Sequence, residues 1–134
     1  MNPPQVLIER SAVEALCDPT SAHHAPVTTA YLALLEEFEE DQLLLVAVGD
    51  HLRPHRAWHE VVHRGPLAAI DALHVGRQHR RVAHRMTTAR GFDRALTLVM
   101  CQRHKVERML TLDPYFTEFD LNVQLVGDFD DAGL

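Results

Sequence analysis

Four acidic side chains stand beside apolar segments of this chain, where they could act together. Glu9, Asp50 and Asp113 each come at the end of an apolar run or directly after it, and Asp93 opens a further apolar segment. Carboxylates that lie close together repel one another unless a cation lies among them, and hard oxygen ligands suit Mg²⁺ or Mn²⁺. Such a metal can activate water and neutralise the charge of a phosphodiester, so the pattern favours metal-dependent hydrolysis.

Each of these acids also has a purely structural interpretation. Asp93 would be favoured at a helix N-terminus, and Asp113 precedes Pro114 in an ordinary turn. Asp50 could cap a helix, and Glu9 could be a solvated strand end. None of these interpretations requires the acids to converge, so their convergence in space is the observation that favours a shared site.

The segment 50–65 carries histidines at intervals of four residues, a spacing that places side chains on one stripe of a helix. They are His51, His55, His59 and His63. The last three extend over two helical turns, about 12 Å at 1.5 Å per residue, which is too far for a single metal ion. We therefore expect His51 or His55 at the rim of the acidic site. The other two are expected on a surface or a subunit interface that would be sensitive to pH near 6.5.

The net charge is −6, but its sign changes along the chain. Residues 1–50 carry a net charge of −8, residues 51–110 carry +8, and the remainder carries −6. The basic middle is nearly all arginine, which suits forked contacts with phosphate. We therefore predict that Arg77, Arg81 and Arg94 contact the backbone of a nucleic acid. The alternative is an ordinary solvated helical face.

Strands and helices alternate among the elements that must position these residues. Apolar runs predict four strands, at residues 5–9, 42–48, 106–112 and 120–126. Helices are predicted after a capping box with Ser11 as its N-cap, and over residues 27–41, 77–86 and 92–104, with a further helix on the histidine segment. Residues 65–75 are open between helix and extended chain.

Strands separated by helices imply parallel pairing, so we predict a single α/β domain over residues 1–134. It has a central twisted parallel sheet with helices on both faces, and the acidic residues 127–134 form a frayed tail. The carboxyl ends of parallel strands share one edge, where ligands bind. Glu9, Asp50 and Asp113 would meet at that edge, near Asp93.

The compartment is indicated by what the sequence lacks. No apolar run is long enough to span a membrane, and no signal-peptide pattern occurs. Cys17 and Cys101 lie in apolar segments without metal-binding spacing. We therefore expect a cytoplasmic protein with buried free thiols.

Two stretches resemble the PIN-domain ribonucleases. The first, VLIERSAVEAL, is similar to the opening strand of that family, in which an acid, any residue, Ser and Ala lead into a helix. The second, FDRALTLVMCQRHKVERMLTLDPYF, resembles the C-terminal half of the family, with Asp93, Thr111, Asp113 and Phe116 at the motif positions. The resemblance extends over about residues 5–126, and the size fits the VapC-type toxins of bacterial toxin–antitoxin modules.

This resemblance implies a PIN-like domain and an endoribonuclease activity. Glu9, Asp93 and Asp113 would be the catalytic residues that hold Mg²⁺ or Mn²⁺, with a metal-bound water attacking phosphorus. Ser11 and Thr111, which match motif positions, would help to bind the substrate. The resemblance also implies an RNA substrate, a small antitoxin protein that blocks the site, and a homodimer.

The sequence departs from the family pattern at two places. Glu9 stands where the family has Asp. In the segment GDHLRPHRAWHE the one Glu, Glu60, comes about a turn later than the Glu that the family places after the second strand. Asp50 or His55 lies nearest to that position and is a possible further metal ligand. One alternative is therefore a PIN-fold protein that binds RNA or protein with little or no catalysis. Another is a metal or pH sensor built on the histidine stripe.

Overall fold

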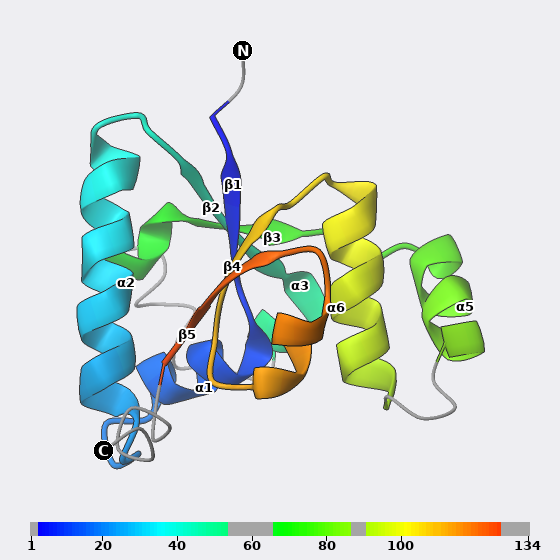
Figure 1. Cartoon of the computed structure of the whole chain (residues 1–134), viewed down its shortest axis with the longest axis horizontal. Coiled ribbons are helices and arrows are strands. Elements are labelled where there is room, and N and C mark those ends of the chain that lie inside the picture. Colours follow the sequence, from blue (N-terminus) through cyan, green and yellow to red (C-terminus); the bar gives the residue numbers. More distant parts are fainter. Residues whose placement is uncertain (1–2, 54–65, 87–90, 127–134) are drawn as a thin grey trace.

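The computed structural model describes residues 3–53, 66–86 and 91–126. A five-stranded sheet crosses its centre in the order β3-β2-β1-β4-β5, and every neighbouring pair of strands is parallel (Figure 1). The strands are β1 (Gln5–Ile8), β2 (Leu44–Val48), β3 (Ile70–Leu73), β4 (Arg108–Thr111) and β5 (Asn122–Leu125). The predicted α/β class with a parallel sheet is confirmed.

All four predicted strands are present, and β3 is a fifth. It arises from the segment that the sequence left open between helix and extended chain. β3 lies at the edge of the sheet, and of its four residues only Ile70 is buried. A strand with so few buried positions has no continuous apolar run, which is why the sequence pattern did not distinguish it.

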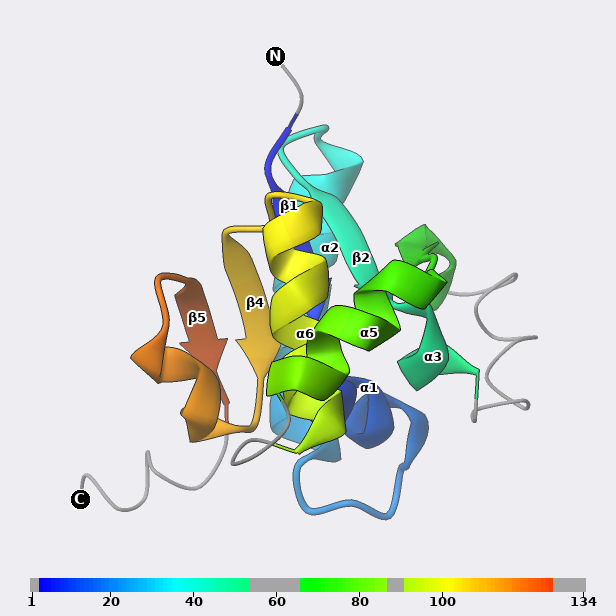
Figure 2. The same cartoon turned by 90° about the vertical axis from the view of Figure 1, so that its right-hand side faces the viewer.

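Helices cover both faces of the sheet, as the sequence predicted (Figures 1 and 2). The α-helices are α1 (Arg10–Cys17), α2 (His24–Glu39), α3 (Gly49–Leu52), α5 (Arg77–Met86) and α6 (Phe92–Arg103), and 3₁₀ turns lie at Pro66–Ala69 and Pro114–Glu118. Helices α1 and α2 pack on one face, and α6, with α5 against it, packs on the other. In the described part of the chain, none of these helices is long and apolar enough to cross a membrane.

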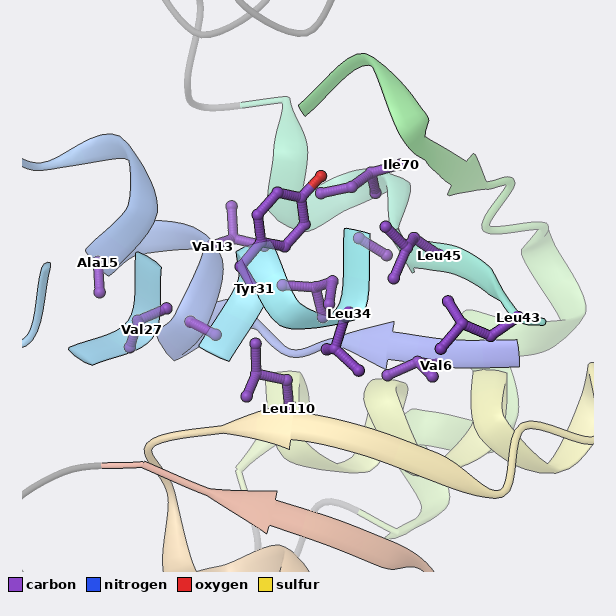
Figure 3. Close-up of a cluster of buried hydrophobic side chains, with 13 residues drawn as sticks. Val6, Val13, Ala15, Val27, Tyr31, Leu34, Leu43, Leu45, Ile70 and Leu110 are labelled. Atoms are coloured by element: carbon purple, nitrogen blue, oxygen red, sulfur yellow. The ribbon is translucent and has the colours of Figure 1, made fainter. Parts of the chain in front are cut away.

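Strand β1 lies in the middle of the sheet and is buried on both faces. Val6 and Ile8 belong to the cluster beneath α2, where Tyr31 is almost completely buried (Figure 3). Leu7 points to the opposite face and belongs to the cluster beneath α6, because successive side chains of a strand alternate between faces. This double burial fixes the end of β1, and with it the position of Glu9.

The N-cap of α1 is Glu9, and the capping box predicted at Ser11 is wrong. The strand ends at Ile8 and the helix begins at Arg10, so Ser11 already lies inside the first turn. The Glu9 side chain accepts a hydrogen bond from the backbone N–H of Ser11 at 3.0 Å. The side chain that begins the helix is therefore the first of the predicted site acids.

Both cysteines are free thiols. Cys101 is buried on the face covered by α6, and Cys17 is partly buried in α1. Burial raises the pKa of each thiol to about 12. Neither side chain is therefore ionised at neutral pH, as expected for cysteines that pack in a core and do not react.

Candidate active site

Three of the predicted site acids lie around one pocket at the carboxyl ends of β1 and β4. Glu9 follows β1, Asp113 follows β4, and Asp93 stands in the first turn of α6. The pocket has a volume of about 370 Å³ and is lined by Glu9, Arg10, Ser11, Gly91, Phe92, Asp93, Arg94 and Asp113. Strand polarity and the N-terminus of α6 therefore bring together residues that are up to 104 positions apart in the chain.

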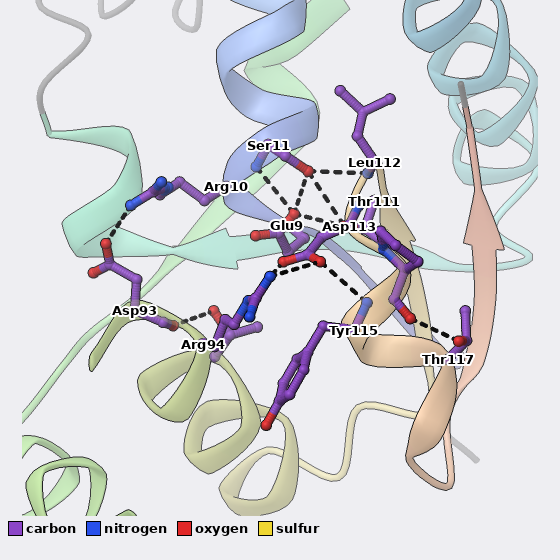
Figure 4. Close-up of polar contacts among 12 residues, drawn as sticks. Glu9, Arg10, Ser11, Asp93, Arg94, Thr111, Leu112, Asp113, Tyr115 and Thr117 are labelled. Atoms are coloured by element: carbon purple, nitrogen blue, oxygen red, sulfur yellow. Dashed lines mark hydrogen bonds and ion pairs between the residues drawn. The ribbon is translucent and has the colours of Figure 1, made fainter. Parts of the chain in front are cut away.

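Glu9 is almost completely buried, and its side chain links the end of β1 to the neighbouring strand β4 (Figure 4). Its Oε1 atom accepts hydrogen bonds from the hydroxyl of Thr111 at 2.6 Å and from both the backbone N–H and the hydroxyl of Ser11. The two hydroxyls also accept hydrogen bonds, from the backbone N–H groups of Leu112 and Asp113, both at 2.9 Å. Because each hydroxyl has one proton, both protons are directed to Glu9.

Asp93 lies between an arginine and a histidine. One carboxylate oxygen forms an ion pair with Nη1 of Arg10, whose Nε lies 3.3 Å from Oε1 of Glu14. The other oxygen lies 3.6 Å from Nε2 of His51, which is 5% exposed. Burial lowers the pKa of His51 below its ordinary value. His51 therefore lies beside Asp93, but it is buried and does not line the pocket.

Asp113 is held by a forked arginine contact. Arg94 donates to its two carboxylate oxygens from Nε at 2.9 Å and from Nη2 at 3.1 Å. The backbone N–H of Tyr115 donates to Oδ1 at 3.1 Å. The guanidinium also stacks over the Tyr115 ring, 4.6 Å from its centre, a cation–π contact that fixes its orientation.

Asp50 belongs to a neighbouring cluster and does not line the pocket. Arg80 of α5 forms a forked contact with its carboxylate, and Nη2 of Arg53 lies 3.4 Å from Oδ1. Gly49, the residue before Asp50, packs closely against the end of β3, because a Cβ at this position would lie 2.8 Å from the backbone oxygen of Leu73. His55, the other candidate for a further metal ligand, lies outside the described residues, as do His59 and His63.

The residues predicted to bind substrate differ in position and exposure. Arg94 and Ser11 line the pocket, whereas Arg77 and Arg81 are exposed on α5 and do not. Thr111 has no exposed surface, so its hydroxyl contacts Glu9 and the backbone and does not reach solvent. Sequence reasoning missed Arg10. The signal available for it was its position directly after Glu9, as the first residue of the helix that Glu9 caps.

Arginines form ion pairs with two of the three carboxylates of the pocket, Asp93 and Asp113. Converging carboxylates are expected from the sequence to need a metal cation, but Arg10 and Arg94 provide positive charge from the chain itself. Among residues 3–53, 66–86 and 91–126, no group of three or more His, Cys, Asp or Glu side chains is placed to hold a metal ion. As they lie, the pocket acids therefore do not fit Mg²⁺ or Mn²⁺.

Comparison with known proteins identifies the fold. The sequence matches no protein-family model and no curated protein. The structure is similar to the crystal structure of VapC20 from Mycobacterium tuberculosis, which is described as a sarcin–ricin loop cleaving toxin. The TM-score is 0.59 at 12% sequence identity, over 87% of this chain and 98% of that chain. At this identity the likeness shows the fold alone, and the chain has a PIN-like α/β fold.

Proposed function

We propose that this chain is an endoribonuclease that hydrolyses RNA phosphodiesters at the pocket of Glu9, Asp93 and Asp113. The observation that carries the proposal is the meeting of these three acids, from distant segments, at the carboxyl edge of a PIN-like sheet. The likeness to a sarcin–ricin loop cleaving toxin supports the same class of activity.

In this proposal, arginine side chains contact the phosphates of the RNA substrate. The side chains of Arg10 and Arg94 are each 45% exposed, so they can turn from a carboxylate to a phosphate that enters the pocket. A guanidinium binds phosphate in a fork and stabilises charge that develops on its oxygens. Arg77 and Arg81, exposed on α5, would hold the RNA backbone outside the pocket without reading bases.

The proposed cofactor is Mg²⁺ or Mn²⁺. The pocket acids offer the hard oxygen ligands that these ions prefer. Asp50, which the sequence offered as a further ligand, is paired with Arg80 and does not line the pocket, so the proposal leaves His55 as the further candidate. Because the acids do not fit a metal as they lie, the proposal requires Arg10 and Arg94 to leave their carboxylates before the cofactor is held.

An RNA cleavage assay tests this function. The purified chain is incubated with a labelled RNA hairpin and a labelled single strand, with Mn²⁺ or with EDTA. We expect cleavage with Mn²⁺ and none with EDTA. Asp71→Asn, a control that removes an exposed acid of β3 outside the pocket, should cleave as fast as wild type. If neither RNA is cut in Mn²⁺, the nuclease proposal fails.

The ion pairs of the pocket favour a second candidate, a PIN-fold module that binds RNA without cutting it. Asp93 and Asp113 both have arginine partners in the free protein, so the pocket has no need of a metal to be stable. This candidate predicts RNA binding that weakens steeply with salt and no cleavage. Fluorescence anisotropy of the labelled single strand, measured in EDTA and in Mn²⁺, separates binding from cleavage.

We further propose that the protein is a cytoplasmic toxin that a small antitoxin protein neutralises, and that it forms a homodimer. In this proposal a basic side chain of the antitoxin enters the acidic pocket. Leu32, a large apolar side chain of α2 that is 44% exposed, is available for contact with a second copy. Light scattering at micromolar concentration should give at least a dimer. A strictly monomeric mass would contradict the homodimer.

A further inference from the structure

We propose that α5 has a pH-sensitive cap, in which the neutral ring of His79 holds the first turn of the helix and releases it when the ring takes up a proton. The proposal concerns the fold of α5 and does not depend on whether the pocket of Glu9 cuts RNA. His79 also lies apart from the histidine stripe of residues 51–63, on the helix that packs against α6.

Gly76 and His79 close the N-terminus of α5 in both directions. Gly76 precedes the helix, and its backbone oxygen accepts from the backbone N–H of Arg80 at 3.2 Å. Its own backbone N–H donates to Nδ1 of His79, the third residue of the helix, at 2.9 Å. This second bond is one half of a capping box, in which the accepting side chain is usually Glu or Gln. Because only a ring nitrogen without a proton can accept, the bond requires a neutral ring protonated at Nε2.

The surroundings of His79 are positively charged. The first turn of α5 begins with Arg77 and has no acidic residue. At the end of α6, the ring of His104 lies 6.4 Å from the ring of His79, centre to centre, and Arg103 directly precedes it. Burial lowers the pKa of His79 below its ordinary value, and the charges of Arg103, His104 and His74 lower it further. The neutral ring that the cap requires is therefore the favoured form near neutral pH.

Protonation of His79 would act against the first turn of the helix in more than one way. It removes the acceptor of the Gly76 N–H, since Nδ1 then has a proton of its own. It also places a positive charge at the N-terminus of a helix, where the macrodipole disfavours it, and brings that charge close to Arg103. The first turn leads to Arg80, whose forked contact with Asp50 joins α5 to α3, so the cap also supports this contact between helices.

The sign of the pH dependence follows from the direction of the pKa shift. The folded protein holds the pKa of His79 below 6.5, the ordinary value that the ring regains on unfolding. The cap therefore contributes its full stability above about pH 6.5 and loses it as the pH falls below that value. Between about pH 7.5 and about pH 5.5, the Tm of wild type should fall roughly 3 °C more than that of His79→Gln. Glutamine can accept from the same N–H and does not titrate.

Nuclear magnetic resonance of the ¹⁵N-labelled full chain tests the proposal directly. The ring nitrogens report the tautomer of His79, and the backbone amide signal of Gly76 reports its hydrogen bond. At about pH 7.5 we expect the ring proton on Nε2, and we expect the Gly76 signal to titrate together with the ring as the pH falls to about 5.5. In His79→Gln that titration should disappear. The matched control is His84→Gln, because His84 is an exposed histidine in the last turn of the same helix, and the Gly76 titration should be unchanged there.

Three outcomes would overturn the cap. They are a His79 ring protonated on Nδ1 at neutral pH, a Gly76 signal that does not follow the ring, and a Gly76 titration that persists in His79→Gln. The first two are measured on wild type alone, so the test does not depend on the folding of a variant. None of the measurements involves RNA, so failure of the cap and failure of the nuclease proposal are separate results.

Discussion

Replacement of Asp93 by Asn is expected to lower Mn²⁺-dependent RNA cleavage by roughly two orders of magnitude or more, with the fold intact. The amide has the same shape as the carboxylate, but it lacks the charge that the proposed cofactor requires. Asp93 is the most accessible of the three acids, with a side chain that is 49% exposed beside the pocket. Single-turnover cleavage of the labelled hairpin in Mn²⁺ measures the loss.

The stability of the Asp93→Asn protein should change little. The variant loses a half-exposed ion pair and a charge at the N-terminus of α6, together worth about 1 kcal/mol or less. Arg10 keeps its contact with Glu14. Thermal unfolding without metal gives the comparison, with Asp71→Asn as the control acid. An Asp93→Asn protein that cleaves as fast as wild type would show that the activity comes from elsewhere.

The sequence could predict the layout of the fold because burial leaves a periodic signal. Three strands that are buried in the sheet interior or close to it were evident as apolar runs, and α5 begins and ends where its pattern predicted. Of the two edge strands, β5 alternates exposed and partly buried residues, which leaves a pattern in the sequence. β3 has only Ile70 buried and no such alternation, so it could not be distinguished. The N-cap of α1 was misplaced by two residues because Glu9 and Ser11 both suit a helix start, and only the end of β1 decides between them.

The candidate site, too, could be predicted from the sequence only in part. Convergence of Glu9 and Asp113 follows from the polarity of parallel strands, which a sequence pattern can indicate. The arginine partners leave no such pattern, because Arg10 and Asp93 are 83 positions apart and half-exposed ion pairs impose no periodicity. The sequence also allowed Glu9 to be a solvated strand end, whereas it is 6% exposed. Its buried carboxylate is bound by hydroxyls from helix α1 and strand β4, which meet only in the fold.

Substitution of Thr111 by Val is expected to lower the free energy of unfolding by about 2 kcal/mol. Thr111 is fully buried, and valine has nearly the same shape, so the change removes a hydroxyl and little else. That hydroxyl donates to Oε1 of Glu9 at 2.6 Å and accepts from the backbone N–H of Asp113 at 2.9 Å. Its loss leaves a buried carboxylate with one donor fewer and an N–H without its acceptor, and hydrogen bonds to charged groups are the stronger ones.

The matched control is Thr97→Val in α6. Thr97 is also almost completely buried, but its hydroxyl donates only to the backbone oxygen of Asp93, at 2.9 Å. We expect that loss to cost less than about 1 kcal/mol, because no charged group loses a partner. Urea denaturation of both variants, with unchanged m-values, measures the difference. Equal destabilisation by the two substitutions would mean that the hydroxyl of Thr111 contributes nothing special to Glu9, and that the end of β1 is held by packing alone.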